Sequence, residues 1–530
     1  MTSRRWHTLA AALLAFLVVN GVLSIRNKNL TYDEIVHYTY GTHILELDSR
    51  RFDDSKMPVS ALNALPEKLT SLLLPDSTFT AYVKTLQVGR FVTIMFSALL
   101  ALLVAYWARA LYGSTAGLLA LFLYVFDPNI TAHSQLITTD LYAALSITFA
   151  GYTFWRFARH RSWRNGLAFG TALGLAQIAK YTAVFLYALF PLLLLVHDGR
   201  CLLTLIQHRR RQTMLRYAKR GLLQAFAVAF MSLFIINVGF LFNRSFTPLA
   251  AYTFRSALFQ AVQAKSAALP FIRIPVPYPY VEGLDWVTDR ERTGAGYSRV
   301  YLLGQLQERG RGFVGYYFVA YLYKVPLAAQ ILTVAALMSL LRSASWRRFV
   351  HRELFLLGPI AFFLLYFNFF NKAQIGIRFI LPIFPMSHVF AARLIHGWSA
   401  WTMRARVAVA VLAAYLVVSV LSYYPQYLAY FNELVPDRRM AYKVLADSNL
   451  DWGQNRLYLE QYLRVHPGVH VSPAHPVSGT IVVSVNELVG VGAKPETFQW
   501  LRDHFEPVST IQYSYLVFDI TPEQLDALAR

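Results

Sequence analysis

The chain has 530 residues, of which 56% are hydrophobic and only 15% are charged. Soluble domains carry roughly a quarter charged residues, so this composition excludes an ordinary soluble protein and indicates a membrane protein with several spans. The net charge of +21 would suggest nucleic-acid binding in a soluble protein, but here most basic residues lie in short loops between apolar runs, where they set topology. The single cysteine, Cys201, excludes an internal disulfide framework.

The first apolar run covers residues 8–25 and follows Arg4 and Arg5. A basic start before an apolar run resembles a signal peptide, but no clear small-residue cleavage site follows it and many further apolar runs do. We therefore interpret this run as an uncleaved first membrane span.

A charged stretch, Thr31-Tyr32-Asp33-Glu34-Ile35-Val36-His37, comes shortly after this span. Asp33 and His37 are four residues apart, and Glu34 and His37 are three apart, spacings that place side chains on one face of a helical turn. Charges beside hydrocarbon cost desolvation free energy, so the cluster is a candidate functional site. The alternative is a short interfacial helix that is capped by Thr31 and has two acids in its first turn.

Eleven apolar runs are long enough, or nearly so, to cross about 30 Å of hydrocarbon. They cover residues 8–25, 88–108, 116–126, 141–157, 166–178, 181–196, 222–242, 313–341, 354–370, 379–395 and 407–423. The eighth contains Lys324-Val325-Pro326, which predicts a kink or a partly interfacial segment because proline breaks a helix. An odd number of spans puts the two ends of the chain on opposite sides of the membrane.

The loop charges agree with this topology. Arginine-rich loops at residues 156–164, 209–220, 342–352 and 404–406 all fall on the side of the N-terminus. The positive-inside rule places that side in the cytoplasm. The outer side then receives the loops 26–88, 127–140, 243–312 and 371–378 and the C-terminal tail. We therefore expect a multi-pass protein of the cytoplasmic membrane whose C-terminus is periplasmic or extracellular.

The tail changes character after about residue 424, so we divide the chain into a membrane domain, 1–424, and a small extracytoplasmic α/β domain, 425–530. Strand-like runs cover residues 479–485 and 513–520, and helix-like runs cover 455–464 and 522–529. The run Asp447-Ser-Asn-Leu-Asp451-Trp-Gly453 has some features of a calcium loop, but its glycine is one place late and its twelfth position is Tyr458. A capped turn leading into a helix is the preferred interpretation.

The unusual charges of the outer side gather on one membrane face. Lys56 and Arg90 follow the acidic stretch, His133 and Asp140 bracket the second outer loop, and Arg378 precedes the tenth span. Fixed bases suit an anionic headgroup such as a phosphate, and fixed carboxylates suit proton removal or a metal. Each also has an ordinary alternative: interfacial anchoring for the arginines, a helix start for Asp140 and a plain loop position for His133.

Three motifs in this order carry a family resemblance. They are Tyr32-Asp33-Glu34-x-x-His37, then Asp127-Pro-Asn-Ile-Thr-Ala-His133-Ser-Gln-Leu-Ile-Thr-Thr-Asp140, then Gly376-Ile-Arg378-Phe-Ile-Leu-Pro382. Together they resemble the protein O-mannosyltransferase-like group of C-type membrane glycosyltransferases, which is similar to the aminoarabinose transferases of lipid A. The resemblance covers residues 5–424, and residues 447–454 look like the tail of bacterial members. It implies the polytopic α-helical fold of that class.

The resemblance also implies a chemistry: a polyprenyl-phosphate-linked sugar as donor and inversion at the anomeric carbon. It implies Asp33 as catalytic base and Asp140 as the second acid of the site. Glu34 is a third catalytic candidate. The substrate-binding candidates are His37, Lys56, Arg90, His133 and Arg378. Relatives often show Lys-Pro-Pro where this chain has Lys56-Met57-Pro58, and no segment has the length of the β-trefoil inserted in eukaryotic mannosyltransferases.

The resemblance leaves several points open. No cofactor is required, although a divalent metal held by Asp33, Glu34, His133 and Asp140 fits the residue types. The acceptor can be a protein, a lipid or a glycan, and membrane lipids are further expected partners, whereas nucleic acid is not. A transporter or flippase of a lipid-linked precursor is the main alternative, and it predicts internal repeats and broken helices. A scaffold for cell-envelope assembly would leave Asp33, Asp140 and Arg378 without a role.

Overall fold

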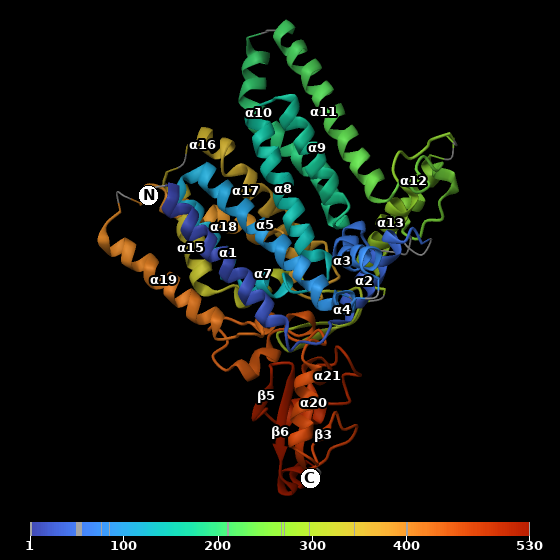
Figure 1. Cartoon of the computed structure of the whole chain (residues 1–530), viewed down its shortest axis with the longest axis vertical. Coiled ribbons are helices and arrows are strands. Elements are labelled where there is room, and N and C mark those ends of the chain that lie inside the picture. Colours follow the sequence, from blue (N-terminus) through green and yellow to red (C-terminus); the bar gives the residue numbers. More distant parts are fainter. Residues whose placement is uncertain are drawn as a thin grey trace.

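The structure is a computed structural model that describes residues 3–48, 56–75, 77–83, 85–208, 211–266, 268–269, 271–295, 297–343, 345–398 and 401–528. Most of the chain is helical, and a small sheet domain lies at one end of the helical part (Figure 1). The N-terminus lies in the helical part, away from the sheet domain, and the C-terminus lies at the tip of that domain (Figure 1).

Each apolar run expected from the sequence is helical over most of its length. The helices are α1 (Ser3–Ile25), α5 (Leu86–Tyr112), α6 (Ser114–Val125), α8 (Thr139–Arg159), α9 (Trp163–Gln177), α10 (Leu186–Gln207), α11 (Arg211–Gly239), α14 (Tyr316–Lys324), α15 (Leu327–Arg342), α17 (Leu354–Phe369), α18 (Ile383–Ala391) and α19 (Met403–Leu421). A 3-10 turn, η3 (Tyr181–Phe185), precedes α10, and two others, η5 (Ile377–Ile380) and η6 (Ala392–Ile395), flank α18.

The length and apolar character of these helices make the chain an integral membrane protein. In the described residues, five helices are long and apolar enough to cross a membrane: Arg4–Ile25, Leu86–Tyr112, Tyr181–Thr204, Arg211–Gly239 and Met403–Leu421. The bent pair α14 and α15 adds a sixth if it forms one span, and Ser114–Val125, Leu354–Phe369 and Ile383–Ile395 are shorter apolar helices. The count of eleven spans stays a prediction.

The eighth apolar run is broken, as its proline predicted. The chain bends by 112° between the axes of α14 and α15, at Val325 and Pro326. Lys324 ends α14 and is buried, and its Nζ donates hydrogen bonds to the carbonyl oxygens of Leu428 (2.7 Å) and Asn449 (2.6 Å). The break therefore ties the helical part to the chain that follows α19.

Shorter elements make up the segments between the apolar helices. The first long loop contains α2 (Tyr32–Leu45), η2 (Pro58–Ser60), α3 (Ala61–Leu73) and α4 (Thr78–Val83), and the second contains α7 (Pro128–His133). Residues 243–312 form η4 (Leu249–Ala251), α12 (Ala257–Lys265), α13 (Tyr278–Thr293) and an antiparallel pair, β1 (Val300–Leu302) and β2 (Gln305–Gln307); α16 (Trp346–His351) precedes α17.

The C-terminal tail forms the α/β structure that its sequence predicted. Three turns, η8 (Tyr427–Ala429), η9 (Arg438–Lys443) and η10 (Asp447–Asn449), precede α20 (Arg456–Val465). The sheet has the order β3-β4-β6-β5, from β3 (His470–Val471), β4 (Gly479–Ser484), β5 (Ser509–Ile511) and β6 (Tyr515–Ile520). Helices α21 (Val485–Leu488), α22 (Gln499–His504) and α23 (Pro522–Leu528) complete it. The domain boundary at residue 424 stays a prediction.

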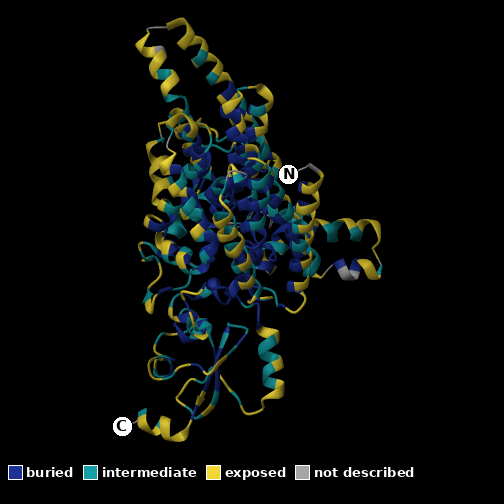
Figure 2. Ribbon diagram, turned by 90° about the vertical axis from the view of Figure 1, so that its left-hand side faces the viewer, coloured by how far each residue is buried: buried dark blue, intermediate teal, exposed yellow. Residues whose placement is uncertain are grey.

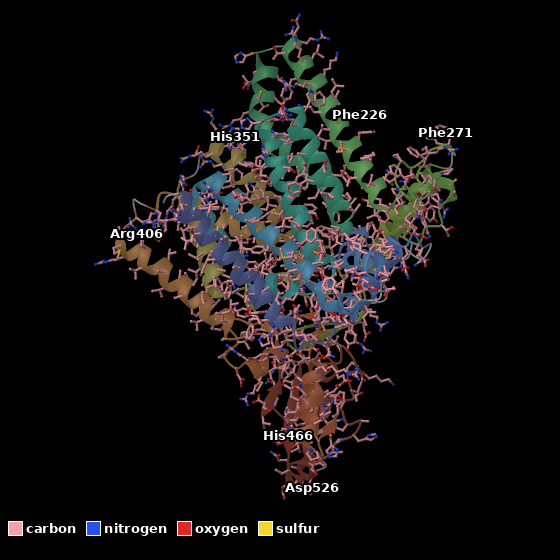
Figure 3. The ribbon with its side chains drawn as sticks, in the orientation of Figure 1. Phe226, Phe271, His351, Arg406, His466 and Asp526 are labelled. Carbon is pink, nitrogen blue, oxygen red and sulfur yellow. The ribbon has the colours of Figure 1, made fainter. Side chains whose placement is uncertain are left out.

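The buried residues are concentrated inside the helical part and where it meets the sheet domain, and exposed residues cover the outside (Figure 2). The arginine-rich loops lie away from the sheet domain: the labelled His351 and Arg406 are far from His466 and Asp526 (Figure 3). The molecule therefore has a basic end and an opposite end that carries the sheet domain.

Candidate functional site

The centre of the candidate site is an ion pair between Asp33 and Arg378. Asp33 lies in the first turn of α2, and Arg378 lies in η5, just before α18. Arg378 Nη1 donates to Asp33 Oδ2 at 3.0 Å. The Asp33 side chain is 42% exposed, whereas that of Arg378 is only 10% exposed. The pair thus presents an accessible carboxylate on a fixed cation.

Asp140 belongs to the same cluster but is buried. It lies in the first turn of α8, and Lys180, which precedes η3, donates from Nζ to Asp140 Oδ1 at 2.5 Å. Arg378 Nη1 lies 3.8 Å from Asp140 Oδ2, so this guanidinium stands between the two carboxylates. Because two cations already occupy Asp140, Asp33 is the carboxylate more accessible to a substrate.

Trp452 holds Arg378 from the other side. The Arg378 guanidinium lies over the Trp452 indole at 3.9 Å from the ring centroid, a cation–π arrangement that orients the side chain. His133 contacts the same indole edge to face, at 6.1 Å between ring centroids. His133 is buried and lines neither of the polar cavities described below. It supports Trp452 and does not reach the position expected of a substrate ligand.

Glu34 and Arg90 form a separate, fully buried pair. Arg90 Nε donates to Glu34 Oε1 at 2.8 Å and Arg90 Nη2 donates to Glu34 Oε2 at 2.7 Å. The backbone N–H groups of Thr31 and Ile137 donate to the same carboxylate. The pair therefore fixes the start of α2 against α5 and the loop before α8. Neither side chain lines the cavity beside Asp33, so their expected catalytic and phosphate-binding roles do not follow from this geometry.

A polar cavity of about 270 Å³ opens beside Asp33. Four of the sequence candidates, His37, Lys56, Asp140 and Arg378, line it. Its walls also contain Lys180, one of the outer-face charges of the sequence, and three residues that were not sequence candidates for the site, Arg290, Glu291 and Tyr297. The last three come from α13 and the chain after it, inside a long polar segment where no local motif marks them.

His37 is a neutral member of this cavity. Burial, reinforced by the nearby Lys56 ammonium, keeps the pKa of His37 below its usual value. Its Nδ1 lies 3.4 Å from the Ser60 hydroxyl. A neutral imidazole can exchange hydrogen bonds with a sugar hydroxyl but adds no positive charge for a phosphate.

An apolar groove of about 790 Å³ borders the polar cavity. Its lining comes from α2, η2, α3, α5, α8, α9 and the end of α11 and includes Leu62, Phe96, Leu103, Phe149 and Ile178. Adjacent residues link the two spaces: Met57 lines the cavity and Pro58 the groove, and Lys180 lines the cavity and Ala179 the groove. A molecule with a charged head and a long hydrocarbon chain fits this combination.

The structure does not assemble the metal-ligand set considered from the sequence. Within the ranges given above, no three His, Cys, Asp or Glu side chains form a group that could hold a metal ion. Glu34 is occupied by Arg90, and His133 lies against Trp452. Asp33 and Asp140 face Arg378 and Lys180 instead, a cationic environment that suits an anion.

Sequence comparison shows one family match. Residues 78–213 match the family described as dolichyl-phosphate-mannose-protein mannosyltransferase. The matched region includes Asp140 and Lys180, and it confirms the resemblance to mannosyltransferase-like proteins that the motifs indicated. No curated protein matches the chain.

Solved structures with a similar course of the chain include two enzymes. ArnT from Cupriavidus metallidurans bound to undecaprenyl phosphate has a TM-score of 0.47 at 12% identity, over 98% of both chains. The oligosaccharyltransferase of Archaeoglobus fulgidus in its apo form has a TM-score of 0.46 at 13% identity, over 88% of this chain and 60% of that one. The oligosaccharyltransferase AglB from the same archaeon, in complex with an inhibitory peptide and a dolichol-phosphate, has a TM-score of 0.44 at 15% identity, over 86% of this chain and 60% of that one.

Proposed function

We propose that the protein is an inverting glycosyltransferase that moves a sugar from a polyprenyl-phosphate donor to an acceptor hydroxyl on the outer face of the cytoplasmic membrane. The observation that carries this proposal is the Asp33–Arg378 pair, set in the wall of a polar cavity that borders an apolar groove. The match of residues 78–213 to a family described by a dolichyl-phosphate sugar supports the choice of donor.

Asp33 acts as general base in this proposal. Its carboxylate takes the proton of the acceptor hydroxyl as the hydroxyl oxygen bonds to the anomeric carbon. The bond between that carbon and the phosphate oxygen breaks at the same time, and its electron pair leaves with the polyprenyl phosphate. Attack from the face opposite the leaving group inverts the anomeric carbon. Asp140 positions Arg378 and Lys180, which it binds, for this step.

The leaving phosphate is stabilised by fixed cations. Lys56, Lys180, Arg290 and Arg378 line the cavity, and preorganised charges of this kind stabilise the charge that develops in a transition state. The polyprenyl chain lies in the apolar groove, where hydrocarbon is removed from water or lipid without burying polar groups. His37 contacts a sugar hydroxyl, and Glu34 acts through Arg90 on the position of α2.

A transporter of a lipid-linked precursor remains the second candidate, because α14 and α15 form a broken helix of the kind that such proteins use. Mass spectrometry distinguishes the two functions. Membranes with and without the protein are supplied with a polyprenyl-phosphate hexose labelled in the sugar. The membranes are then dissolved in detergent, so that no two sides of a membrane remain. A transferase still converts the labelled donor into free polyprenyl phosphate and a labelled product under these conditions. Intact donor in solution, with labelled donor translocated only in sealed vesicles, would establish the transporter.

A further inference from the structure

A second polar cavity, of about 410 Å³, lies against the same central ion pair. Asp33, Tyr297, Ile375 and Arg378 line both polar cavities. The rest of the second cavity comes largely from the chain after α19. Those residues are Asp447, Asp451, Trp452, Ser484, Asn486, Glu487, Val491 and Gly492. The helical part and the sheet domain thus build this space together, directly beside the carboxylate that we assign as base.

The two cavities differ in charge. Lys56, Lys180 and Arg290 line only the first. The second contains the carboxyl groups of Asp447, Asp451 and Glu487, in addition to Asp33. Among its described lining residues, Arg378 is the one lysine or arginine. A phosphate is attracted to the first cavity and repelled from the second, so the second cavity suits the other substrate of the transfer.

The walls of the second cavity contain two features that a packing role does not require. Asp447 has a left-handed backbone conformation, with φ of 58°, which is strained for a residue other than glycine. It is held there because Ser298 Oγ donates to its Oδ2 at 2.7 Å and its own N–H donates to Asn486 Oδ1 at 2.7 Å. Arg378 Nε is buried and has no hydrogen-bond partner in the described chain, so a residue that lines this cavity keeps one unsatisfied N–H.

We propose that the second cavity is the acceptor subsite and that its carboxylates select a hydroxyl acceptor that carries a positive charge. This inference rests on the glycosyl transfer proposed above. The acceptor hydroxyl reaches Asp33 from the side of Trp452 and the sheet domain, while the donor phosphate occupies the first cavity. The cation of the acceptor lies among Asp447, Asp451 and Glu487, where burial strengthens the attraction between opposite charges.

The protonation of Asp451 gives this proposal a pH signature. Burial, with a smaller contribution from the carboxylates of Asp447 and Glu487, raises the pKa of Asp451 to about 6. The other titratable groups coupled to it are the phenols of Tyr32 and Tyr515. Asp451 loses its proton as the pH rises through this value, so binding of a cation should tighten between roughly pH 5 and pH 7.

Three small sugars that differ in charge test the proposal on the purified full-length protein in detergent. The probes are glucosamine, glucose and glucuronate, and their dissociation constants are measured by calorimetry at pH 7 and pH 5. We expect glucosamine to bind about tenfold more tightly than glucose at pH 7, and glucuronate to bind most weakly, because a charge-assisted contact is worth roughly a factor of ten or more. The preference for glucosamine should shrink at pH 5.

Two carboxylate variants and a matched control complete the test. Glu487→Gln and Asp451→Asn should each lose most of the preference for glucosamine, and Asp451→Asn should also lose its pH dependence. Asp519→Asn is the control, because Asp519 lies in the same domain, is exposed and bonds only to Thr480 in the described structure; it should bind like the parent.

Undecaprenyl phosphate binding, measured on the same samples, separates this inference from the function on which it rests. Equal affinities for the three sugars, no glucosamine binding at the highest soluble concentration, or a preference that survives in both carboxylate variants would overturn the acceptor subsite even if undecaprenyl phosphate binds. Failure of the parent protein to bind undecaprenyl phosphate would instead overturn the proposed donor.

Discussion

Asp33 and Glu34 are neighbours in the sequence with opposite environments in the fold. Asp33 forms an ion pair with Arg378 and is half exposed, whereas Glu34 forms an ion pair with Arg90 and is fully buried. A helix places consecutive side chains about 100° apart, so one points into the cavity and the other into the protein. The two interpretations of the Thr31–His37 stretch, a reactive site and a capped helix start, therefore each describe one of the two acids.

Replacement of Asp33 tests the proposed base. Asp33→Asn keeps the size of the side chain but cannot accept the proton, so we expect transfer to fall by about 10² to 10⁴, measured as labelled product formed per unit time. Binding of undecaprenyl phosphate and the melting temperature should stay close to those of the parent. Glu46→Gln, an exposed acid-to-amide change at the end of the same helix, is the control and should transfer normally. An Asp33→Asn protein with more than about a tenth of the parent rate would contradict the assignment.

Replacement of Glu34 tests the buried pair as a structural element. Glu34→Gln leaves Arg90 buried without its counter-charge, and removing one partner of a buried pair costs about 3–5 kcal/mol of folding stability. The comparison is Glu308→Gln, which breaks the exposed pair with Arg299 and should cost about 1 kcal/mol or less. Denaturant or thermal unfolding in detergent measures both. Equal stabilities of the two variants would show that the buried pair is not needed for folding.

The candidate site could be predicted from the sequence only where a motif marks its residues. Asp33, His37, Lys56, Asp140 and Arg378 follow from local motifs and do meet around one cavity. Arg290, Glu291 and Glu487 belong to segments without such a motif, and Asp447 and Asp451 lie in a run that the sequence marked as a turn and not as part of the site, so only the folded chain brings these residues within reach. Arg90 and His133 show the opposite case, since a polar residue in or near a motif can equally well support the site from behind without contacting a substrate.

At the scale of elements, the close contact between η5 and η10 positions Arg378. Gly376 has φ of 150°, and a Cβ at this position would lie 2.3 Å from Ser448 Oγ, while Ser448 Oγ itself donates to the Ile375 carbonyl oxygen. Only glycine tolerates this backbone conformation readily. The motif at Gly376 and the motif at Asp447 therefore fit together without room for a methyl group.

Gly376→Ala should separate these two motifs and move Arg378. We expect a loss of transfer of up to about 10²-fold, since a displacement of about 1 Å at a site can have this effect. Gly304→Ala is the matched control, because Gly304 also has a positive φ, of 80°, but its Cβ would meet nothing within 4 Å. Both changes should cost stability on the order of 1–3 kcal/mol, but only the first should slow transfer. Equal transfer rates in the two variants would contradict the positioning role.

The elements themselves were largely predictable because their signals are local. Apolar runs predicted α1, α5, α8 and α11, and the strand-like runs in the tail predicted β4 and β6 of the sheet domain. The proline at residue 326 gave the break between α14 and α15. The sequence did not indicate α12 or α13, since a polar segment that folds against other parts of the chain has no periodic apolar face of its own.

At the scale of the whole molecule, the charges and the sheet domain predict an orientation in the membrane. The basic loops lie at one end and the sheet domain at the other (Figures 1 and 3), so we expect the N-terminus inside and the C-terminus outside. A phosphatase fused after Arg530 should be active in whole cells, and one fused at Arg211 should be inactive. A fluorescent protein that folds only in the cytoplasm, fused at the same points, is the control and should give the reverse pattern. Activity at Arg211 alone would invert the topology.

The position of Arg378 in the wall of both polar cavities has a consequence for the steady-state kinetics. If Arg378 contacts both the donor and the acceptor, both substrates must be bound before the sugar is transferred. The single displacement proposed above forms no covalent bond between the sugar and the enzyme. Initial rates measured while donor and acceptor are varied in turn should therefore give double-reciprocal lines that intersect. Parallel lines would reveal a substituted-enzyme intermediate, with the sugar held covalently between two half-reactions, and Asp33 would then be its first candidate carrier.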